Sequence, residues 1–472
     1  MRGPTQLSSP RAYPQPESPS LLNKQNRPSG PALPVIDPEE INANRRIAVR
    51  CVLVFLFIRF GFLHELIRAK TGVNTYMVLI SALITIPAVI LGGGLRRTFS
   101  AGAARVWFVF AGWLLIDTIF SQWITGSAHA VSGYVQTVTP MVLVTAGVVL
   151  TMKEFASMMY AFGFASLSNI LTARFFGSQN SERENLGVGT IANANDFGAH
   201  LIFILPFLLF AILTVRSKTI KTIATGLFIY GLYLGAKTGS RGALLAIGFV
   251  LVFILLRAPA RVRIAVLVGV PLLSAVLIAV LPSYITARYG TLFNSDSATA
   301  PEEAVQSAAA RKELFWKGVQ MTMEHPLTGV GVEQFQIANG AGLVAKGIHA
   351  EWQVAHNTYT QLSGETGVPG FLIYVIGMVS AFLLMNSSVK LCRGRPDLKV
   401  AGTAGFCLMM SLLGFGTASF FISQAYSFYM PTLAGVAVAL NRVVRRQIAA
   451  QAQLQPPVPG FQPMRPAVAR RA

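Results

Sequence analysis

Charged residues are scarce in this chain. They make up only 12% of its 472 residues, whereas hydrophobic residues make up 53% and the mean hydropathy is +0.54. A soluble domain carries about twice that share of charge. Several apolar runs exceed the roughly 18 residues needed to cross the hydrocarbon core of a bilayer, and they lack the two-residue alternation of barrel strands. The composition therefore excludes a soluble globular protein and predicts an all-α, polytopic membrane protein.

Several motifs for cofactor chemistry are also missing. The chain has only five aspartates, and it contains no D-x-D, H-E-x-x-H, P-loop or G-x-S-x-G sequence. These absences disfavour a metal-dependent sugar-nucleotide transferase and an ATP-driven machine. The three cysteines, Cys51, Cys392 and Cys407, lie in or beside apolar runs, so no disulfide framework is expected.

The apolar runs predict about twelve transmembrane helices. Their approximate bounds are 47–65, 76–95, 106–123, 131–150, 155–175, 196–215, 220–235, 242–256, 264–281, 367–385, 400–421 and 425–440. The predicted organisation is a disordered N-terminal tail (1–44), nine helices (45–281), a long loop (282–366), three helices (367–441) and a disordered basic tail (442–472). The N-terminal tail is rich in Pro, Ser and Asn, so no cleavable signal peptide is expected.

The distribution of basic residues orients these helices. The formal net charge is +20, which in a soluble protein would indicate a nucleic-acid partner. Here Lys and Arg cluster in alternate short loops, such as 96–105, 257–263 and 390–399, as topology signals do. We therefore expect no nucleic-acid partner, and we place these loops and both termini in the cytoplasm. The long loop 282–366 then lies on the outer side.

An arginine opens one of the predicted helices on that outer side. Arg241 lies in the sequence TGSRG (238–242), after Ser240, where topology disfavours a positive charge. A guanidinium beside free helix N–H groups suits a phosphate or diphosphate. The alternative is an anchor at the membrane surface. The sequence favours anion binding.

Two further outer segments carry polar residues. In LGVGTIANANDFGAH (186–200), Asn193, Asn195 or Asp196 could cap the next helix, and the glycines and asparagines could instead hydrogen-bond a sugar. Capping fits the composition better. The segment 310–335 has apolar residues at helical spacing and predicts an amphipathic helix that lies on the membrane or packs over the bundle. Its Arg311 is a candidate second cation for the same cavity as Arg241.

The segment AHNTYTQLSGETGVPGFLIY (355–374) precedes the tenth helix. His356 is a candidate general base, because histidine titrates near neutral pH, although a lone histidine is more often structural. Glu365 lies nine residues later, which in an unbroken helix places it on the opposite face, about 13 Å along the axis. One residue is therefore expected to be catalytic and the other structural, unless Gly364 or Gly367 breaks the helix.

Charges inside the predicted helices are rare. Asp117 in the third helix and Arg59 in the first have similar depths. Buried charges in a membrane pair or mark function, so we expect an ion pair between these two residues.

Four of these segments occur together, and in this order, in a known family. The chain resembles the bacterial O-antigen ligase and O-antigen polymerase-like superfamily in GTIANAND (189–196), TGSRGA (238–243), RKELFWKGVQMTMEHPLTGVGVEQF (311–335) and HNTYTQLSGETGVPG (356–370). The resemblance covers about residues 45 to 446. It implies a GT-C-like glycosyltransferase of the bacterial inner membrane, with its active site facing the periplasm.

The resemblance also implies a reaction and a set of site residues. Such enzymes transfer a glycan from undecaprenyl diphosphate to an acceptor hydroxyl, on a lipid A core in ligases or on another lipid-linked repeat in polymerases, without metal or cofactor. His356 matches the position credited with the catalytic base, and Arg241 and Arg311 are candidates for stabilising the diphosphate. The remaining candidates for binding or support are Asn193, Asn195, Ser240, Tyr359 and Glu365.

Other functions remain open at this point. Ligases and polymerases share these motifs, so the sequence does not separate them. A transporter or flippase of lipid-linked glycans predicts internal repeats and charged, broken helices near the midplane, which the sequence does not clearly have. A structural scaffold leaves the outer arginines and His356 unexplained.

Overall fold

The computed structural model describes residues 42–180, 183–191, 193–294, 301–345, 347, 349 and 352–454. The predicted disordered N-terminal tail lies almost wholly outside these residues. Two short strands, β1 (Ser178–Asn180) and β2 (Arg183–Asn185), pair antiparallel with Ser178 opposite Asn185. The described α-helices are α2 (Ala43–Gly61), α3 (Leu63–Thr71), α4 (Met77–Leu91), α5 (Gly94–Phe99), α6 (Gly102–Thr118), α7 (Ile124–Thr137), α8 (Thr139–Gly147), α9 (Met152–Phe176), α10 (Ala194–Thr214), α11 (Lys218–Lys237), α12 (Arg241–Arg257), α13 (Ala260–Val280), α14 (Ser283–Gly290), α15 (Glu302–Glu324), α16 (Phe335–Ala345), α17 (Thr358–Cys392), α18 (Lys399–Ala418) and α19 (Tyr429–Leu454).

The predicted class, an all-α membrane protein, is confirmed at this coarse level, and each of the twelve predicted spans overlaps a helix. Four described segments are long and apolar enough to cross a membrane: α10, α13, α17 and Pro396–Phe421, which contains α18. The helices α2 and α3, bent by 49°, together give a fifth. Others, such as α4 with 15 residues, are shorter than the roughly 20 that a span needs. The twelve-span topology stays a prediction.

One predicted span, 131–150, is interrupted. The helix α7 ends at Thr137, and α8 begins at Thr139 with Pro140 in its first turn. Proline suits the first turn of a helix but cannot donate the hydrogen bond that a helix interior needs. The single predicted helix is therefore two helices.

Aromatic side chains join α2, α10 and α19 in the core. The ring of Phe60 stacks on Phe203 at 5.5 Å between centroids and meets Phe428 edge-on at 5.0 Å. The fully buried His200 lies 2.9 Å from the Tyr429 hydroxyl through its Nδ1. Aromatic pairs contribute about 0.5–1.5 kcal/mol each beyond their burial. These contacts hold α2, α10 and α19 against one another.

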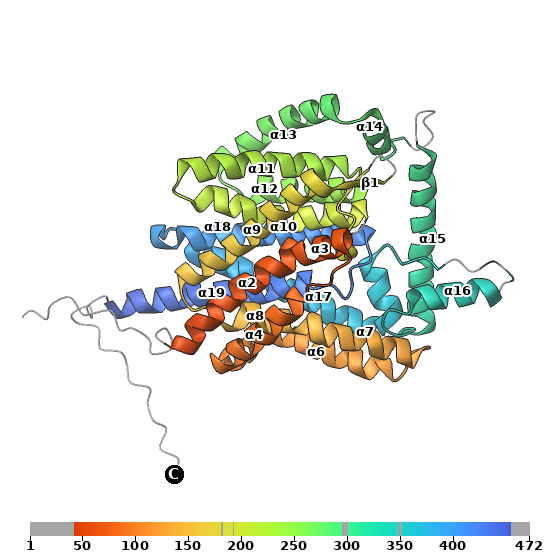
Figure 1. Cartoon of the computed structure of the whole chain (residues 1–472), viewed down its shortest axis with the longest axis horizontal. Coiled ribbons are helices and arrows are strands. Elements are labelled where there is room, and N and C mark those ends of the chain that lie inside the picture. The colour runs from red at the N-terminus through yellow and green to blue at the C-terminus, as the bar shows by residue number, and fades with distance from the viewer. Residues whose placement is uncertain are drawn as a thin grey trace, which may run out of the picture.

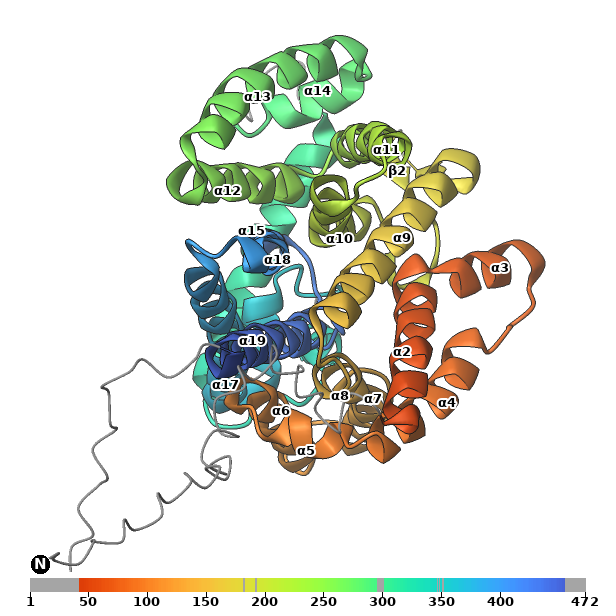
Figure 2. The same cartoon turned by 90° about the vertical axis from the view of Figure 1, so that its left-hand side faces the viewer.

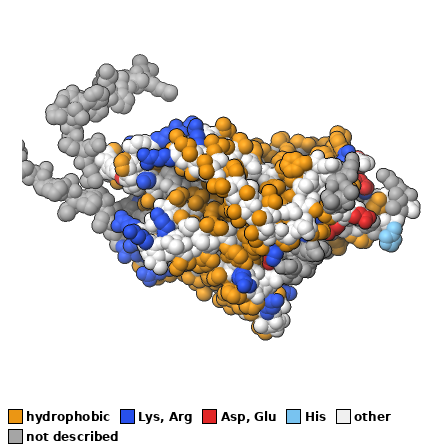
Figure 3. Space-filling model, turned by 90° about the horizontal axis from the view of Figure 1, so that it is seen from above, with side chains coloured by type: hydrophobic (Ala, Val, Ile, Leu, Met, Phe, Trp, Pro, Cys, Tyr) orange, Lys and Arg blue, Asp and Glu red, His pale blue; other side chains and the backbone are white. Residues whose placement is uncertain are grey.

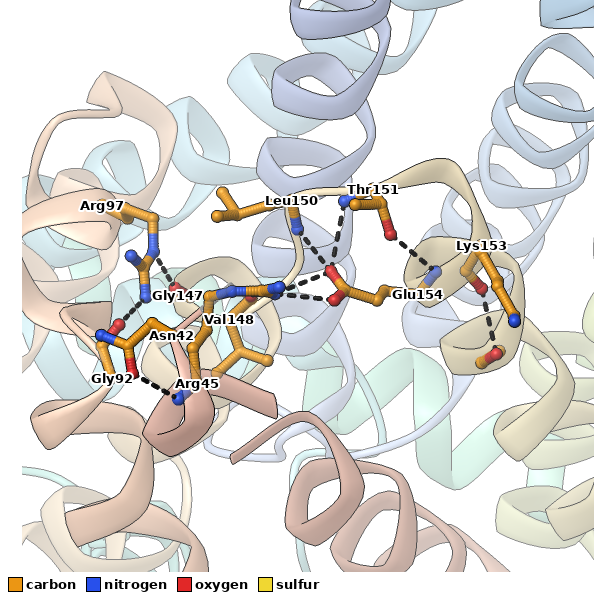
Figure 4. A network of polar contacts seen from close by, with 11 residues as sticks. Asn42, Arg45, Gly92, Arg97, Gly147, Val148, Leu150, Thr151, Lys153 and Glu154 are labelled. Carbon is orange, nitrogen blue, oxygen red and sulfur yellow. Dashed lines mark hydrogen bonds and ion pairs between the residues drawn. The ribbon is translucent and has the colours of Figure 1, made fainter. Parts of the chain in front are cut away.

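A buried ion pair joins α2 to α9 at the opposite end of the bundle (Figure 4). Arg45, only 1% exposed, donates from Nη1 to both carboxylate oxygens of Glu154 at 2.7 and 2.8 Å, and to the Val148 carbonyl at 3.3 Å. Glu154 also forms a capping box with Thr151 at the start of α9. Removal of one partner would leave an uncompensated buried charge, which typically costs about 3–5 kcal/mol.

The helix α19 is longer than the sequence suggested. Residues 442–454 were expected to belong to a disordered tail, but α19 continues to Leu454. Val443 and Val444 are buried, and Arg442 donates to the carbonyl of Arg97 at 2.6 Å and to that of Ala146. Arg442 therefore anchors this part of the helix to α5 and α8, which corrects the expected boundary. The remainder of the predicted tail lies outside the described residues.

The expected pair between Asp117 and Arg59 does not form. The guanidinium of Arg59 lies 4.1 Å from the centre of the Phe428 ring. Asp117 is fully buried in α6, and neither of its carboxylate oxygens has a hydrogen-bond partner among the described residues. The two residues have similar expected depths in the membrane, but their side chains are not in contact.

Charge is distributed unevenly between the two ends of the molecule. Figure 1 shows α14, α15 and α16 at the right-hand end and the C-terminal part of α19 at the left-hand end. In Figure 3, Lys and Arg gather toward the left and Asp and Glu at the right. Such a difference is what the positive-inside tendency produces. Figure 2 shows α13 at the edge of the bundle, and α13 has no buried residue.

Candidate active site

The site lies where several chain segments meet at the right-hand end of Figure 1. Arg241 is the first residue of α12, after a turn in which Ser240 accepts a hydrogen bond from the Ala243 amide at 3.3 Å. The Arg241 side chain donates to Thr291 Oγ1, just after α14, at 3.0 Å and to the Ala304 carbonyl in the first turn of α15 at 2.9 Å. Ser240 thus caps the helix, and Arg241 extends toward α14 and α15.

Two arginines that the sequence analysis did not single out hold this turn. Arg288 of α14, 2% exposed, donates from Nε to the Gly239 carbonyl at 3.1 Å and lies 3.6 Å from Glu303. Arg183 of β2 donates to the Thr238 carbonyl at 2.8 Å. The argument applied to Arg241 could have found them, because both are basic residues in segments assigned to the outer side.

Arg311 lies in the same cluster. It belongs to α15, and its Nε has no hydrogen-bond partner among the described residues. Burial, together with the nearby positive charges of Arg241 and Arg288, lowers the pKa of Arg311 to about 10. The negative charge of Asp196 acts in the opposite direction. The guanidinium groups of this cluster thus lie close enough for their charges to interact, with Asp196 and Glu303 as nearby carboxylates. The excess of positive charge favours an anionic ligand.

His356 lies beside this cluster, just before α17. Its backbone is left-handed, with φ 50°, and its amide donates to Ser423 Oγ at 2.8 Å. A left-handed conformation is uncommon for residues other than glycine and is frequent at functional sites. Burial and the charge of Arg311 lower the pKa of His356 to about 4, so the imidazole is neutral at neutral pH. A neutral imidazole can accept a proton.

The N-terminus of α10 borders the same region. The Asn193 carboxamide oxygen accepts from the amides of Asn195 and Asp196, both at 2.9 Å, so Asn193 caps the helix. The Asn195 side chain accepts from Arg183 at 2.9 Å, and Asp196 accepts from Gln424 at 3.2 Å. Asn193 and Asn195 are therefore engaged in contacts within the protein.

Glu365 and Tyr359 make contacts that hold the protein together. The Glu365 carboxylate, 1% exposed, accepts from the amides of Phe335 at 2.9 Å and Glu333 at 3.2 Å. The Tyr359 hydroxyl donates to the Gly416 carbonyl at 2.7 Å. The helix α17 starts at Thr358, so His356 lies outside it, and the break in α17 is at Gly367, with φ 67°. Glu365 therefore belongs to a short helical segment between His356 and that break.

The structure thus gathers part of the predicted set. It brings Arg241 and Arg311 together with His356, and it adds Arg183 and Arg288. Bordering this group are the predicted residues Ser240, Asn193 and Asn195. The side chains of Tyr359 and Glu365 instead make hydrogen bonds to the backbone of neighbouring segments. Among the described residues, no group of three or more His, Cys, Asp and Glu side chains is arranged to hold a metal ion.

Comparison with known protein families identifies this region. Residues 224–375 match the family model described as O-antigen ligase. Over this segment, about a third of the chain, the protein is O-antigen ligase-like. No curated protein matches the chain.

The matched segment runs from within α11 to within α17. It includes Arg241, Arg288, Arg311 and His356, whereas Arg183 of β2 precedes it. The family supports a ligase- or polymerase-like enzyme of polysaccharide biosynthesis, which acts on lipid-linked glycans in a membrane. The cluster around His356 therefore falls largely within the segment that carries the family signal.

Proposed function

We propose that this protein is an inverting glycosyltransferase that moves a glycan from undecaprenyl diphosphate to an acceptor hydroxyl at the periplasmic face. One observation carries the proposal: Arg311 lies close enough to Arg241 and Arg288, and also to the neutral, partly buried imidazole of His356, for their charges to interact. The cations suit a diphosphate, and the imidazole suits an acceptor hydroxyl. The proposal assigns no role to a metal or a nucleotide.

The proposed reaction is a direct displacement. The acceptor oxygen attacks the anomeric carbon, the bond from that carbon to the diphosphate oxygen breaks, and His356 takes the acceptor proton. The electron pair of the broken bond goes to the leaving lipid diphosphate, whose growing negative charge the arginines stabilise. Attack from the face opposite the leaving group inverts the anomeric centre.

A long apolar cavity supports a lipid-linked donor. It has a volume of about 750 Å³ and is lined mainly by α10, α11, α12 and α18. Gly198 and Ala243 line it near the Ser240 turn, and Arg257 and Arg393 line its other end. A polyprenyl chain in this cavity would bring its diphosphate to the arginines. The cavity wall itself is almost wholly apolar at the end near the Ser240 turn, which suits a hydrocarbon chain.

The proposal includes a topology. Twelve spans in the bacterial inner membrane would leave both termini in the cytoplasm and place the 282–366 segment, with α14 and α15, in the periplasm. The unequal charge of the two ends supports this orientation. The acceptor is then the lipid A core in a ligase or the end of another lipid-linked repeat in a polymerase. No observation on the described residues favours a flippase instead.

Substitution of the two central residues tests the proposal. We expect His356→Ala and Arg241→Ala to lower glycan transfer by about 100-fold or more, since each removes a group that acts in the transition state. Transfer is measured with purified protein and lipid-linked glycan from the native host. Glu313→Ala, at an exposed carboxylate of α15, is the control that should stay active. Normal transfer by both site variants would refute the site.

Deletion of the gene separates the two enzyme types. Loss of a ligase leaves long lipid-linked chains that never reach lipid A. Loss of a polymerase leaves single repeat units. Gel analysis of surface and lipid-linked glycans distinguishes these products, and an unchanged glycan pattern would contradict both.

A further inference from the structure

A second, polar cavity lies beside His356. It is an open cavity of about 250 Å³. It is bordered by α2, by the α7–α8 junction, by α17, by the loop that precedes α16 and by the segment between α18 and α19. Carboxylate, amide and hydroxyl groups line it, from Glu333, Gln361, Ser423, Gln424 and Ser427, together with the guanidinium of Arg59, which lies against the Phe428 ring. Its lining contrasts with the mostly apolar residues around the long cavity.

Two of the lining residues connect this cavity to the candidate site. Ser423 accepts the hydrogen bond from the His356 amide, and Gln424 donates to Asp196 at 3.2 Å. Asp196 in turn lies near enough to Arg311 for their charges to interact. The polar cavity therefore adjoins both the candidate base and the edge of the arginine cluster.

The loop before α16 holds Glu333 in an unusual conformation at the cavity wall. Glu333 has φ 59°, which is uncommon for a residue other than glycine. The Glu365 carboxylate fixes this conformation, because it accepts from the amides of Glu333 and Phe335. Residues held in such a conformation by their surroundings often serve a ligand site.

One amide oxygen in the cavity wall is buried without a hydrogen-bond partner among the described residues. Gln361 donates from Nε2 to Glu365 at 3.3 Å, but its buried Oε1 has no hydrogen-bond partner among the described residues. Buried polar atoms nearly always find a partner in the protein, in water or in a ligand. The cavity is therefore suited to a molecule that carries hydrogen-bond donors.

We propose that this cavity binds a sugar ring of the acceptor glycan, with Glu333 and Gln361 accepting hydrogen bonds from its hydroxyls. This rests on the proposed function, and it places the acceptor on one side of His356 and the diphosphate on the other. The Glu333 carboxylate opposes a diphosphate but accepts readily from hydroxyls. A site built to hydrogen-bond sugar hydroxyls also discriminates well against rings that lack them.

The test uses the full chain, purified, with undecaprenyl diphosphate-linked glycan from the native host as donor. Two acceptors are compared, core-only lipopolysaccharide and a lipid-linked single repeat unit. For the acceptor that the enzyme uses, we expect Glu333→Gln and Gln361→Ala each to raise KM by about tenfold, as expected for one lost hydrogen bond to a charged or buried group. The donor KM and the kcat at saturating acceptor should stay within about twofold.

Two controls make the result specific. Glu324→Gln removes a carboxylate from the exposed end of α15 and should leave every parameter unchanged. Glu333→Gly removes the side chain while tolerating the left-handed backbone, so it reports on the carboxylate without added strain. It should raise the acceptor KM at least as much as Glu333→Gln.

The outcomes separate this proposal from the proposed function. If His356→Ala abolishes transfer but neither Glu333 variant changes the acceptor KM, the acceptor site is refuted and the enzyme assignment stands. If the donor KM rises together with the acceptor KM, the cavity is not specific for the acceptor. If His356→Ala is fully active, the enzyme assignment itself fails.

Discussion

His356 is the residue whose chemistry depends most on its neighbours. Burial disfavours the charged imidazolium, and the positive charge of Arg311 disfavours it further, so the pKa falls from its ordinary value of about 6.5 to about 4. A base with a low pKa is available over a wide pH range but binds a proton weakly. The bound diphosphate would add negative charge nearby and strengthen this base during the reaction.

The pH dependence of transfer follows from this shift. A general base acts in its neutral form, so activity is present above the pKa and is lost as the pH falls through it. We expect kcat/KM, which reports the free enzyme, to fall by half near pH 4. The profile is measured with purified protein over the pH range in which it stays folded. A half-point near 6.5 would show that His356 is not in the environment described above.

Substitution of Arg311 should move the same profile. Arg311→Gln removes a positive charge beside His356, so the imidazole pKa rises and the acidic limb of kcat/KM shifts to higher pH. The shift is partial, because burial is the larger cause and remains. Arg311→Lys keeps the charge and should keep the limb in place, although both variants lose rate. An unshifted limb in Arg311→Gln would mean that the two side chains are not coupled.

At the scale of elements, a buried carboxylate organises the loop before α16. Glu365 accepts from two amides of that loop, and the loop packs on α17 through a hydrogen bond from the Val330 amide to the Gly364 carbonyl at 2.9 Å. Gly329 and Gly331 have positive φ, and a side chain at Gly329 would meet the Glu365 backbone at 2.4 Å. Small residues thus permit the close approach that lets one carboxylate hold the loop.

Loss of this carboxylate should destabilise the loop. Glu365→Ala leaves the amides of Glu333 and Phe335 without their acceptor, and an unsatisfied buried donor costs about 1–3 kcal/mol. We expect a lower melting temperature in detergent and a raised acceptor KM, because Glu333 loses its support. Glu365→Gln retains an acceptor oxygen and should lie between Ala and wild type. Unchanged melting for both variants would contradict this role.

Sequence patterns predicted the elements well but missed local breaks. Long apolar runs indicated the helices that the twelve predicted spans overlap, because helices are what an apolar chain forms in a membrane. They did not indicate α14 and α16, which lie within the predicted long loop. The split at Val138 depends on Pro140, and the extension of α19 depends on contacts of Arg442 with two other helices. The split between α7 and α8 could have been predicted from the proline in the sequence. The extension of α19 reflects a tertiary contact, and residue composition alone does not reveal it.

The whole molecule explains which site residues the sequence could indicate. Arg241, Arg311 and His356 come from segments up to 115 residues apart, and the charge-derived topology put all three on one side. The predicted side of the membrane could not reveal that Arg183 and Arg288 donate hydrogen bonds to the carbonyls of Thr238 and Gly239. Nor could the predicted depth reveal that Arg59 stacks on Phe428 instead of pairing with Asp117. Those contacts depend on helix rotation and on the path of loops.

The proposed orientation makes a prediction for the entire chain. In a background without Cys51, Cys392 and Cys407, single cysteines are introduced by Glu313→Cys on α15 and by Arg395→Cys between α17 and α18, both at exposed positions. If basic loops stay in the cytoplasm, a membrane-impermeant maleimide should label the Glu313→Cys variant in intact spheroplasts. The Arg395→Cys variant should be labelled only after lysis. Because an odd number of spans between the two positions is required for this result, labelling of both variants in intact spheroplasts would overturn the topology and remove the periplasmic placement of His356.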